Sequence, residues 1–125
     1  MNAQTIAKRA YAESTAPTRT PRSVEYELLA RVTHRMKSAA EAGPRAYPKL
    51  VEALSDNLRI WTTLAVDVAD PQNGLPEDLR ARIFYLAEFV RVQTSKVLAK
   101  KARLAPLLEV NAAILRGLRV KAPVK

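Results

Sequence analysis

Residues 70–79 of the 125-residue chain read DPQNGLPEDL, and this stretch separates two helical segments. It contains Pro71 and Asn73-Gly74, a strong turn signal, because Asn and Gly tolerate backbone angles that other residues avoid. Pro76 suits the first position of a helix, where its missing N–H needs no partner. Glu77 and Asp78 follow in the first turn, where carboxylates interact favourably with the helix dipole. The stretch therefore predicts a helix, a tight turn and a second helix that runs back along the first.

Apolar residues recur at helical spacing on both sides of this turn. Pro48 opens the segment before it, and Pro21 and Pro106 open two further segments, over about 21–42 and 106–116. Gly43 and Gly117 stand where those two patterns stop, as glycine does after a helix. The four apolar stripes are Val24, Leu28, Val32 and Met36, widened by Leu29, Ala39 and Ala40; Leu50, Leu54, Trp61, Leu64 and Val68; Leu79, Ile83, Leu86, Val90 and Val97; and Leu107, Leu108, Ile114 and Leu115.

These segments predict an all-α protein, a small antiparallel helical bundle of four main helices with a short N-terminal helix over about residues 2–14. No segment alternates apolar and polar residues with a period of two, so strands are not expected. We expect a single domain over residues 1–125. Within it, residues 1–20 are predicted to be a mobile N-terminal segment and linker, and residues 119–125 a flexible basic tail.

Positive charge is concentrated in the last part of the chain. The net charge is +9, and residues 96–125 hold eight Lys or Arg against one Asp or Glu. Such a segment can attract RNA, an acidic partner or an anionic membrane surface, although solvation of helix faces is the simpler interpretation. The candidates for anion or RNA contact are Lys96, Lys100, Lys101 and Arg103. The same segment has no aromatic residue on which a base could stack.

The residue types that usually carry catalysis are scarce. The chain has no cysteine and one histidine, His34, which cannot build a usual zinc site. Three isolated glycines form neither a P-loop nor a dinucleotide fingerprint. We therefore predict no enzyme, no metal site and no cofactor. No apolar run is long enough to insert into a membrane and the first residues lack the apolar region of a signal peptide, so we expect a cytoplasmic protein.

Two asparagines, Asn57 and Asn111, fall on apolar stripes. One interpretation is that they are buried, hydrogen-bonded within the fold, and determine the register of the helices. The other is that the stripes form a groove for a partner helix and the asparagines contribute specificity.

Several segments together resemble the FlaF family of flagellar biosynthesis regulators. The order and spacing of the segments carry the resemblance, which spans about residues 2–118. The matching segments are Ala10-Tyr11; Pro21-Arg22-Ser23-Val24-Glu25-Tyr26-Glu27-Leu28; Ala53-Leu54, Asn57 and Ile60-Trp61-Thr62 to Asp67; Asn73-Gly74-Leu75-Pro76-Glu77-Asp78-Leu79-Arg80; Ile83, Leu86 and Phe89-Val90; and Leu107-Leu108-Glu109-Val110-Asn111, with Ile114 and Gly117-Leu118.

The resemblance implies a cytoplasmic protein that binds flagellin, acts as a secretion chaperone, and promotes flagellin production and export. The candidate partner-binding residues are Tyr11, Arg22, Asn57, Trp61 and Asn111. Two alternatives remain open. One is a post-transcriptional regulator that contacts flagellin messenger RNA through the basic segment, and the other is an adaptor that binds a second flagellar regulator such as FlbT.

Overall fold

The structure, a computed structural model, describes residues 21–121. Within that range it contains four α-helices, one short 3-10 helix and no strand, so the all-α prediction is confirmed. The predicted N-terminal helix, the predicted linker and residues 122–125 lie outside the described residues. The elements are α2 (Pro21–Ala42), η1 (Pro44–Ala46), α3 (Tyr47–Ala69), α4 (Glu77–Leu98) and α5 (Ala105–Lys121).

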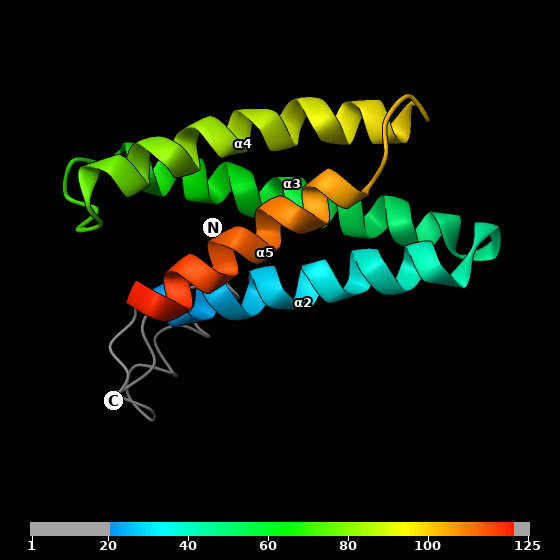
Figure 1. The fold of residues 1–125 in the computed structure, drawn as a ribbon, viewed down its shortest axis with the longest axis horizontal. Coiled ribbons are helices and arrows are strands. Elements are labelled where there is room, and N and C mark those ends of the chain that lie inside the picture. The colour runs from blue at the N-terminus through cyan, green and yellow to red at the C-terminus, as the bar shows by residue number, and fades with distance from the viewer. Residues whose placement is uncertain (1–20, 122–125) are drawn as a thin grey trace, which may run out of the picture.

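The helices α2, α3 and α4 lie side by side, with α3 in the middle and α4 at one edge (Figure 1). Consecutive helices run in opposite directions, as short connections require. The last helix, α5, crosses this layer diagonally and packs mainly against α2. It approaches α4 much less, and one long side of α4 therefore has no neighbouring helix among the described residues.

The turn between α3 and α4 forms where the sequence predicts it. Gly74 has a φ of 90°, a conformation in which a side chain would be strained. The Asp70 carboxylate accepts a hydrogen bond from the backbone N–H of Gln72 at 2.9 Å. Asn73 accepts one from the N–H of Leu75 at 3.2 Å. These side chains pair backbone groups that the two helices leave free, which sharpens the reversal of the chain.

Arg80 ties the start of α4 to the end of α3. Its guanidinium donates hydrogen bonds to the carbonyl oxygens of Val68, at 3.3 Å, and Asp70, at 3.1 Å. Carbonyls at a helix C-terminus have no partner inside the helix and carry partial negative charge, so a cation is favoured there.

The core contains the predicted stripes of α3, α4 and α5 and most of the predicted stripe of α2, of which Leu28 and Ala40 are exposed. Leu28 is 41% exposed, whereas Leu29, Val32, Met36 and Ala39 are buried. Residues four apart advance 400° around a helix, so a run with only that spacing drifts off the core face. The buried residues of α2 alternate steps of three and four, which keeps them on one face.

The predicted end of the last helix is also wrong. Gly117 was expected just beyond it, but α5 continues through Gly117 to Lys121. Gly43, in contrast, ends α2 with a φ of 89°. The chain then forms η1 before α3 begins at Tyr47, a short 3-10 turn that the apolar pattern does not reveal.

A buried hydrogen-bond network joins three helices around the side chain of Asn111 in α5. Its carboxamide oxygen accepts a hydrogen bond from Trp61 Nε1 of α3 at 2.8 Å. Its Nδ2 donates to Asn57 Oδ1 of α3 at 2.8 Å and to Thr33 Oγ1 of α2 at 2.9 Å. Thr33 in turn donates to the carbonyl oxygen of Leu29 at 2.6 Å. Asn57, Trp61 and Asn111 are buried completely. Hydrogen bonds demand specific distances and angles, so this network determines how far each helix slides along its neighbours.

The two asparagines differ in how many of their side-chain polar atoms have a hydrogen-bond partner. Asn111 uses both ends of its carboxamide, whereas Asn57 Nδ2 has no hydrogen-bond partner among the described residues. An unpaired buried donor reduces the stability of the fold.

We therefore expect Asn111→Ala to destabilise the protein more than Asn57→Ala, although both remove the same atoms. The Asn111 variant loses three hydrogen bonds and leaves the Trp61 N–H and Asn57 Oδ1 unpaired, at a cost of about 3 kcal/mol or more. The Asn57 variant loses one hydrogen bond, removes the unpaired amide, and should cost about 1–2 kcal/mol less. Urea unfolding followed by Trp61 fluorescence measures the free energy of unfolding of both variants. Equal decreases in the two variants would contradict the central role of Asn111 in the network.

Candidate partner-binding surface

The five predicted partner-binding residues do not form one surface. Tyr11 lies outside the described residues, and Arg22 falls in the first turn of α2. Asn57, Trp61 and Asn111 come together, but inside the core, where they bond to one another. The structure thus gives these three an internal role, and direct contact with a partner would require the bundle to open.

The four predicted basic residues are all exposed, at the end of α4 and in the loop that follows it. Lys100 has a φ of 61°, and the N–H of Lys101 donates to the carbonyl oxygen of Lys96 at 2.8 Å. This is the Schellman arrangement, in which a residue in the left-handed region ends a helix, here with lysine in the usual place of glycine. The Lys100 ammonium lies 5.2 Å from the ring centre of Tyr47, at the start of α3. Tertiary folding therefore places an aromatic ring beside the basic segment, which has none of its own.

The most distinctive apolar surface lies on the side of α4 that faces away from α3. There Phe84 is 55% exposed, Tyr85 71% and Val92 37%. They lie within about two helical turns, with the exposed Ala81 one turn before them and Ser95 after them. We call these five residues, together with Glu88 between them, the outer face of α4. Large apolar side chains gathered on an exposed helix face are typical of an interaction site.

A single ion pair lies within this face. Arg91 Nε donates to Glu88 Oε1 at 3.2 Å, one helical turn away, and a second nitrogen of Arg91 binds the other carboxylate oxygen. The hydrogen bonds from Arg91 hold the pKa of the Glu88 carboxyl below its usual range. The pair leaves little net charge at the middle of the face at neutral pH.

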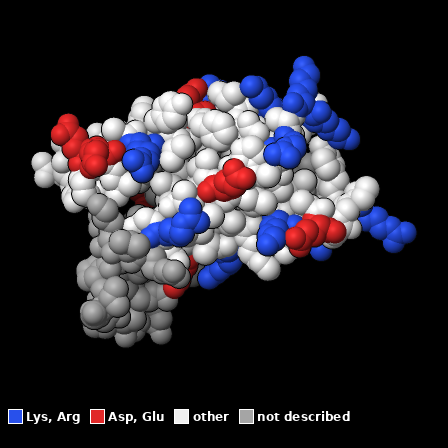
Figure 2. All heavy atoms as spheres, in the orientation of Figure 1, with Lys and Arg blue, Asp and Glu red and all other residues white. Residues whose placement is uncertain are grey.

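The two ends of α4 carry opposite charge. Its first turn holds the exposed Glu77 and Asp78, next to Asp70 of the preceding turn, whereas its last turn and the following loop hold the four lysine and arginine residues. Figure 2 shows carboxylates, with Lys or Arg beside them, at the turn end of the molecule and mainly Lys or Arg at the opposite end of α4. A partner that lies along the outer face meets Glu77 and Asp78 first, then an apolar centre, and then Lys96, while the exposed Arg82 lies about a quarter turn around the helix from that face.

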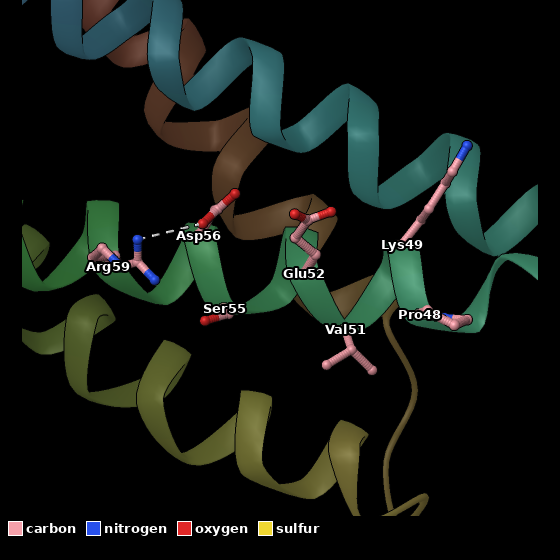
Figure 3. A pocket seen from close by; sticks show the side chains of 7 residues that line it. All are labelled: Pro48, Lys49, Val51, Glu52, Ser55, Asp56 and Arg59. Carbon is pink, nitrogen blue, oxygen red and sulfur yellow. Dashed lines mark ion pairs between the residues drawn. The ribbon is translucent and has the colours of Figure 1, made fainter.

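An open depression of about 610 Å³ lies on α3, on the face of the layer opposite α5 (Figure 3). Its lining comes entirely from α3, with Val51 directed towards α4 and Asp56 towards α2. The residues that line it are Pro48, Lys49, Val51, Glu52, Ser55, Asp56 and Arg59.

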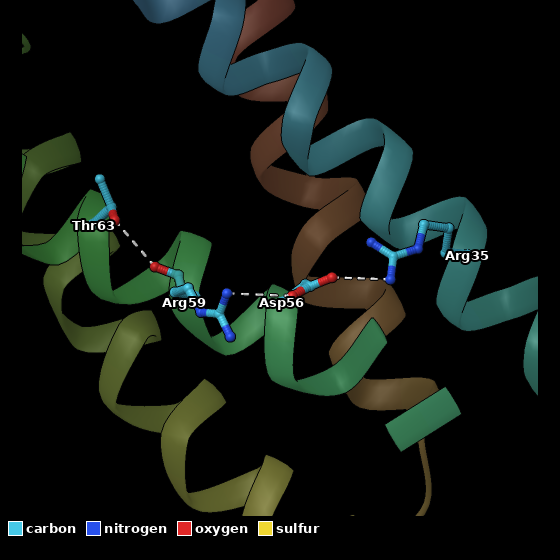
Figure 4. Close-up of polar contacts among 4 residues, drawn as sticks. All are labelled: Arg35, Asp56, Arg59 and Thr63. Atoms are coloured by element: carbon cyan, nitrogen blue, oxygen red, sulfur yellow. Dashed lines mark hydrogen bonds and ion pairs between the residues drawn. The ribbon is translucent and has the colours of Figure 1, made fainter. Parts of the chain in front are cut away.

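Ion pairs occupy the carboxylate of Asp56 in this depression (Figure 4). Arg35 Nη2 of α2 lies 2.9 Å from Asp56 Oδ2, and Arg59 Nη1 lies 3.7 Å from Asp56 Oδ1. Thr63 donates a hydrogen bond to the carbonyl oxygen of Arg59 at 3.1 Å, which extends the same row of polar contacts. Both carboxylate oxygens of Asp56 are thus paired with guanidiniums, and this depression is best explained as a solvated polar face that links α2 and α3.

Between residues 21 and 121 no group of three His, Cys, Asp or Glu residues is placed to hold a metal ion. The sole histidine, His34, is exposed, and its ring lies within hydrogen-bond distance of the Ser38 hydroxyl at 3.3 Å, as expected for a surface residue. None of the described helices has the length and hydropathy needed to cross a membrane.

The outer face of α4 was not singled out among the predicted site residues, although the sequence contains a signal for it. Phe84 and Tyr85 interrupt the stripe of Leu79, Ile83 and Leu86, because neither has the spacing of that stripe. Two adjacent aromatic residues on a helix point about 100° apart, so at most one of them can join a narrow core stripe. Aromatic residues off the stripe are therefore candidates for exposure.

One comparison identifies the chain with a group of known proteins. The family model described as flagellar protein FlaF matches residues 7–118, which include α2, η1, α3, α4 and all but the last residues of α5. No match was found among curated proteins or among solved structures.

The outer face of α4 should tolerate polar substitution without loss of the fold. We expect the double variant Phe84→Ser and Tyr85→Ser to change the free energy of unfolding by no more than about 0.5 kcal/mol per substitution, since exposed positions contribute little. The neighbouring Ile83→Ala should cost about 2–4 kcal/mol, because Ile83 is buried. Urea unfolding of the three proteins, at a dilution at which each is monomeric, tests this, and a large loss of stability in the double variant would mean that the two rings are part of the core.

Proposed function

The chain belongs to the FlaF family of flagellar proteins, and on that premise we propose that it is a flagellar biosynthesis regulator that binds flagellin and promotes flagellin production and export. It acts in the cytoplasm by stoichiometric binding, as a secretion chaperone does, and catalyses no reaction. The observation that supports the proposal is the exposed apolar outer face of α4 on a bundle whose other large apolar residues are mostly buried.

The chemistry of the outer face suits an amphipathic helix. Unpolymerised flagellin exposes amphipathic terminal segments, and such a segment can lay its apolar side on a helix face through anchors three and four residues apart. On α4, Tyr85 and Val92 lie seven residues apart and Phe84 precedes Tyr85, so the three side chains lie on one side of the helix within about two turns. Covering the apolar side of flagellin would suppress its premature assembly until export.

The opposite charges at the two ends of α4 favour one orientation of the bound flagellin segment. A bound segment with basic residues towards Glu77 and Asp78 and acidic residues towards Lys96 is attracted at both ends of α4. The same segment in the reverse direction is repelled at both ends. The proposal therefore includes one preferred orientation of the flagellin segment along α4.

We expect co-expressed flagellin and this protein to form a stoichiometric complex in gel filtration. Phe84→Ser with Tyr85→Ser should weaken it at least tenfold, which corresponds to about 1.4 kcal/mol. Val66→Ser is the matched control, because Val66 is 67% exposed on α3 and is not part of the outer face of α4. Flagellin without its terminal segments should bind weakly to every variant.

Two results would contradict this proposal. One is the absence of a complex with intact flagellin, and the other is a complex that the α4 variants leave unchanged. Recovery of another flagellar regulator from cells that lack flagellin would favour the adaptor function instead.

A second candidate function is contact with flagellin messenger RNA at the basic end of the bundle. The observation that favours it is Tyr47, which is 37% exposed and lies beside Lys100. Single-strand binding proteins combine cations with exposed aromatic rings on which bases stack.

This candidate predicts RNA affinity that falls steeply between about 50 and 200 mM salt, because phosphate contacts release counterions. Neutralising Lys96, Lys101 and Arg103 together should lower the salt slope as well as the affinity, and Tyr47→Ala should lower the affinity alone. Mobility shifts with flagellin messenger RNA measure both effects. No shift at low salt would remove this candidate without affecting the flagellin proposal.

A further inference from the structure

The outer face of α4 is complementary to itself when it is turned end for end. Its acidic end, Glu77 and Asp78, and its basic end, Lys96 with the lysines that follow, lie on either side of an apolar centre. The centre of the face is near Glu88, which is almost midway between the two ends. A two-fold axis near Glu88 would therefore bring each acidic end to a basic end.

We propose that the outer face of α4 is covered by the same face of a second copy of this chain, with the two α4 helices antiparallel. Antiparallel packing makes the opposite charges meet twice, once at each end. Parallel packing would set like charges against each other at both ends, which is destabilising. A contact in which the same surface of both subunits is used closes on itself and produces a dimer rather than a filament.

The apolar residues support the same arrangement. When Tyr85 lies level with Val92 of the second copy, two-fold symmetry also places Val92 level with Tyr85 of the second copy. The interface then contains two such contacts between an aromatic ring and a branched side chain. In this register Asp78 and Lys96 of the second copy are offset along the helix axis by less than about one helical turn of 5.4 Å. Glu88 falls near the axis in this register, so the two Glu88 carboxylates approach each other and each remains paired with Arg91 of its own chain.

The position of α4 in the fold leaves room for a second copy. α2 and α4 are the two edge helices of the layer, and α4, unlike α2, meets α5 only weakly (Figure 1). Val66, the other strongly exposed apolar residue, has the hydroxyl residues Thr62 and Thr63 one turn before it and forms no comparable face. Among the described residues, α4 thus offers the apolar face with the best match to itself.

Dimerisation would protect the apolar residues of α4 in the free protein. The dimer itself does not depend on flagellin, but this consequence rests on the proposed function: a flagellin segment and a second copy would exclude each other from the same face. The resting protein would then keep Phe84 and Tyr85 out of water until a partner is available.

The absence of cysteine from the chain allows a clean test by disulfide formation in the full-length protein. Ala81→Cys with Ser95→Cys places thiols that meet across an antiparallel pair, since both positions are exposed and small. We expect this double variant to form a covalent dimer on mild oxidation. Each single variant should stay monomeric on a denaturing gel, because its two copies lie about 20 Å apart at 1.5 Å per residue.

Sedimentation equilibrium without flagellin gives the second measurement. We expect the unmodified protein to dimerise and the dissociation constant to rise at least tenfold in the Phe84→Ser, Tyr85→Ser variant but not in Val66→Ser. Glu77→Lys with Asp78→Lys should also weaken the dimer. Adding Lys96→Glu and Lys101→Glu to the same chain should restore it, because the charges at the ends are then exchanged.

Three results would overturn the inference. The first is a monomer at all concentrations up to the millimolar range, which would leave α4 to another occupant. The second is efficient disulfide formation in the single variants, which would indicate parallel packing. The third is a dimer that the Phe84, Tyr85 and charge variants leave unchanged. None of these results bears on whether flagellin binds, because flagellin is absent from both experiments.

Discussion

The carboxamide of Asn111 connects three of the four described α-helices, and the arrangement of the bundle depends on this contact. Apolar packing determines which side of each helix is buried, but it is not directional and allows neighbouring helices to slide. The bonds from Asn111 to Asn57, Trp61 and Thr33 hold only at one register, because each needs a donor and an acceptor about 2.9 Å apart. Burial excludes water as a substitute partner, so displacement of any of the three helices leaves polar groups unpaired.

α4 is attached differently from the other helices. It has no part in the Asn111 network and is held by apolar residues such as Ile83 and Val90 and by the hydrogen bonds from Arg80 to the end of α3. Its place at the edge of the layer leaves Phe84 and Tyr85 on the surface. The polar residues that look most specialised in the sequence thus organise the core, while the surface best suited to a partner is an apolar face on the helix outside that network.

The local signals predicted the helices well, and they erred where local and tertiary requirements differ. The turn at residues 70–76 was predictable because Pro71, Asn73 and Gly74 restrict the backbone by themselves. Gly117 was misread as a helix end, since glycine ends a helix only where the chain must adopt positive φ, and α5 continues there in helical conformation. The exposure of Leu28 was missed because a four-residue spacing alone does not show where a stripe leaves the core face.

The sequence by itself determined the helical class, the places of the turns and which helix faces are mostly apolar, because these depend on residues close together in the chain. The order of its segments also indicated the FlaF family. Only the tertiary structure decided that Asn57 and Asn111 bond to each other and to Trp61, that Tyr47 lies beside Lys100, and that the aromatic pair of α4 is left exposed. The first two features are contacts between residues about 50 positions apart, and the third depends on which helix lies at the edge of the layer. All three follow from the way complete helices pack, and no local pattern in the sequence reveals them.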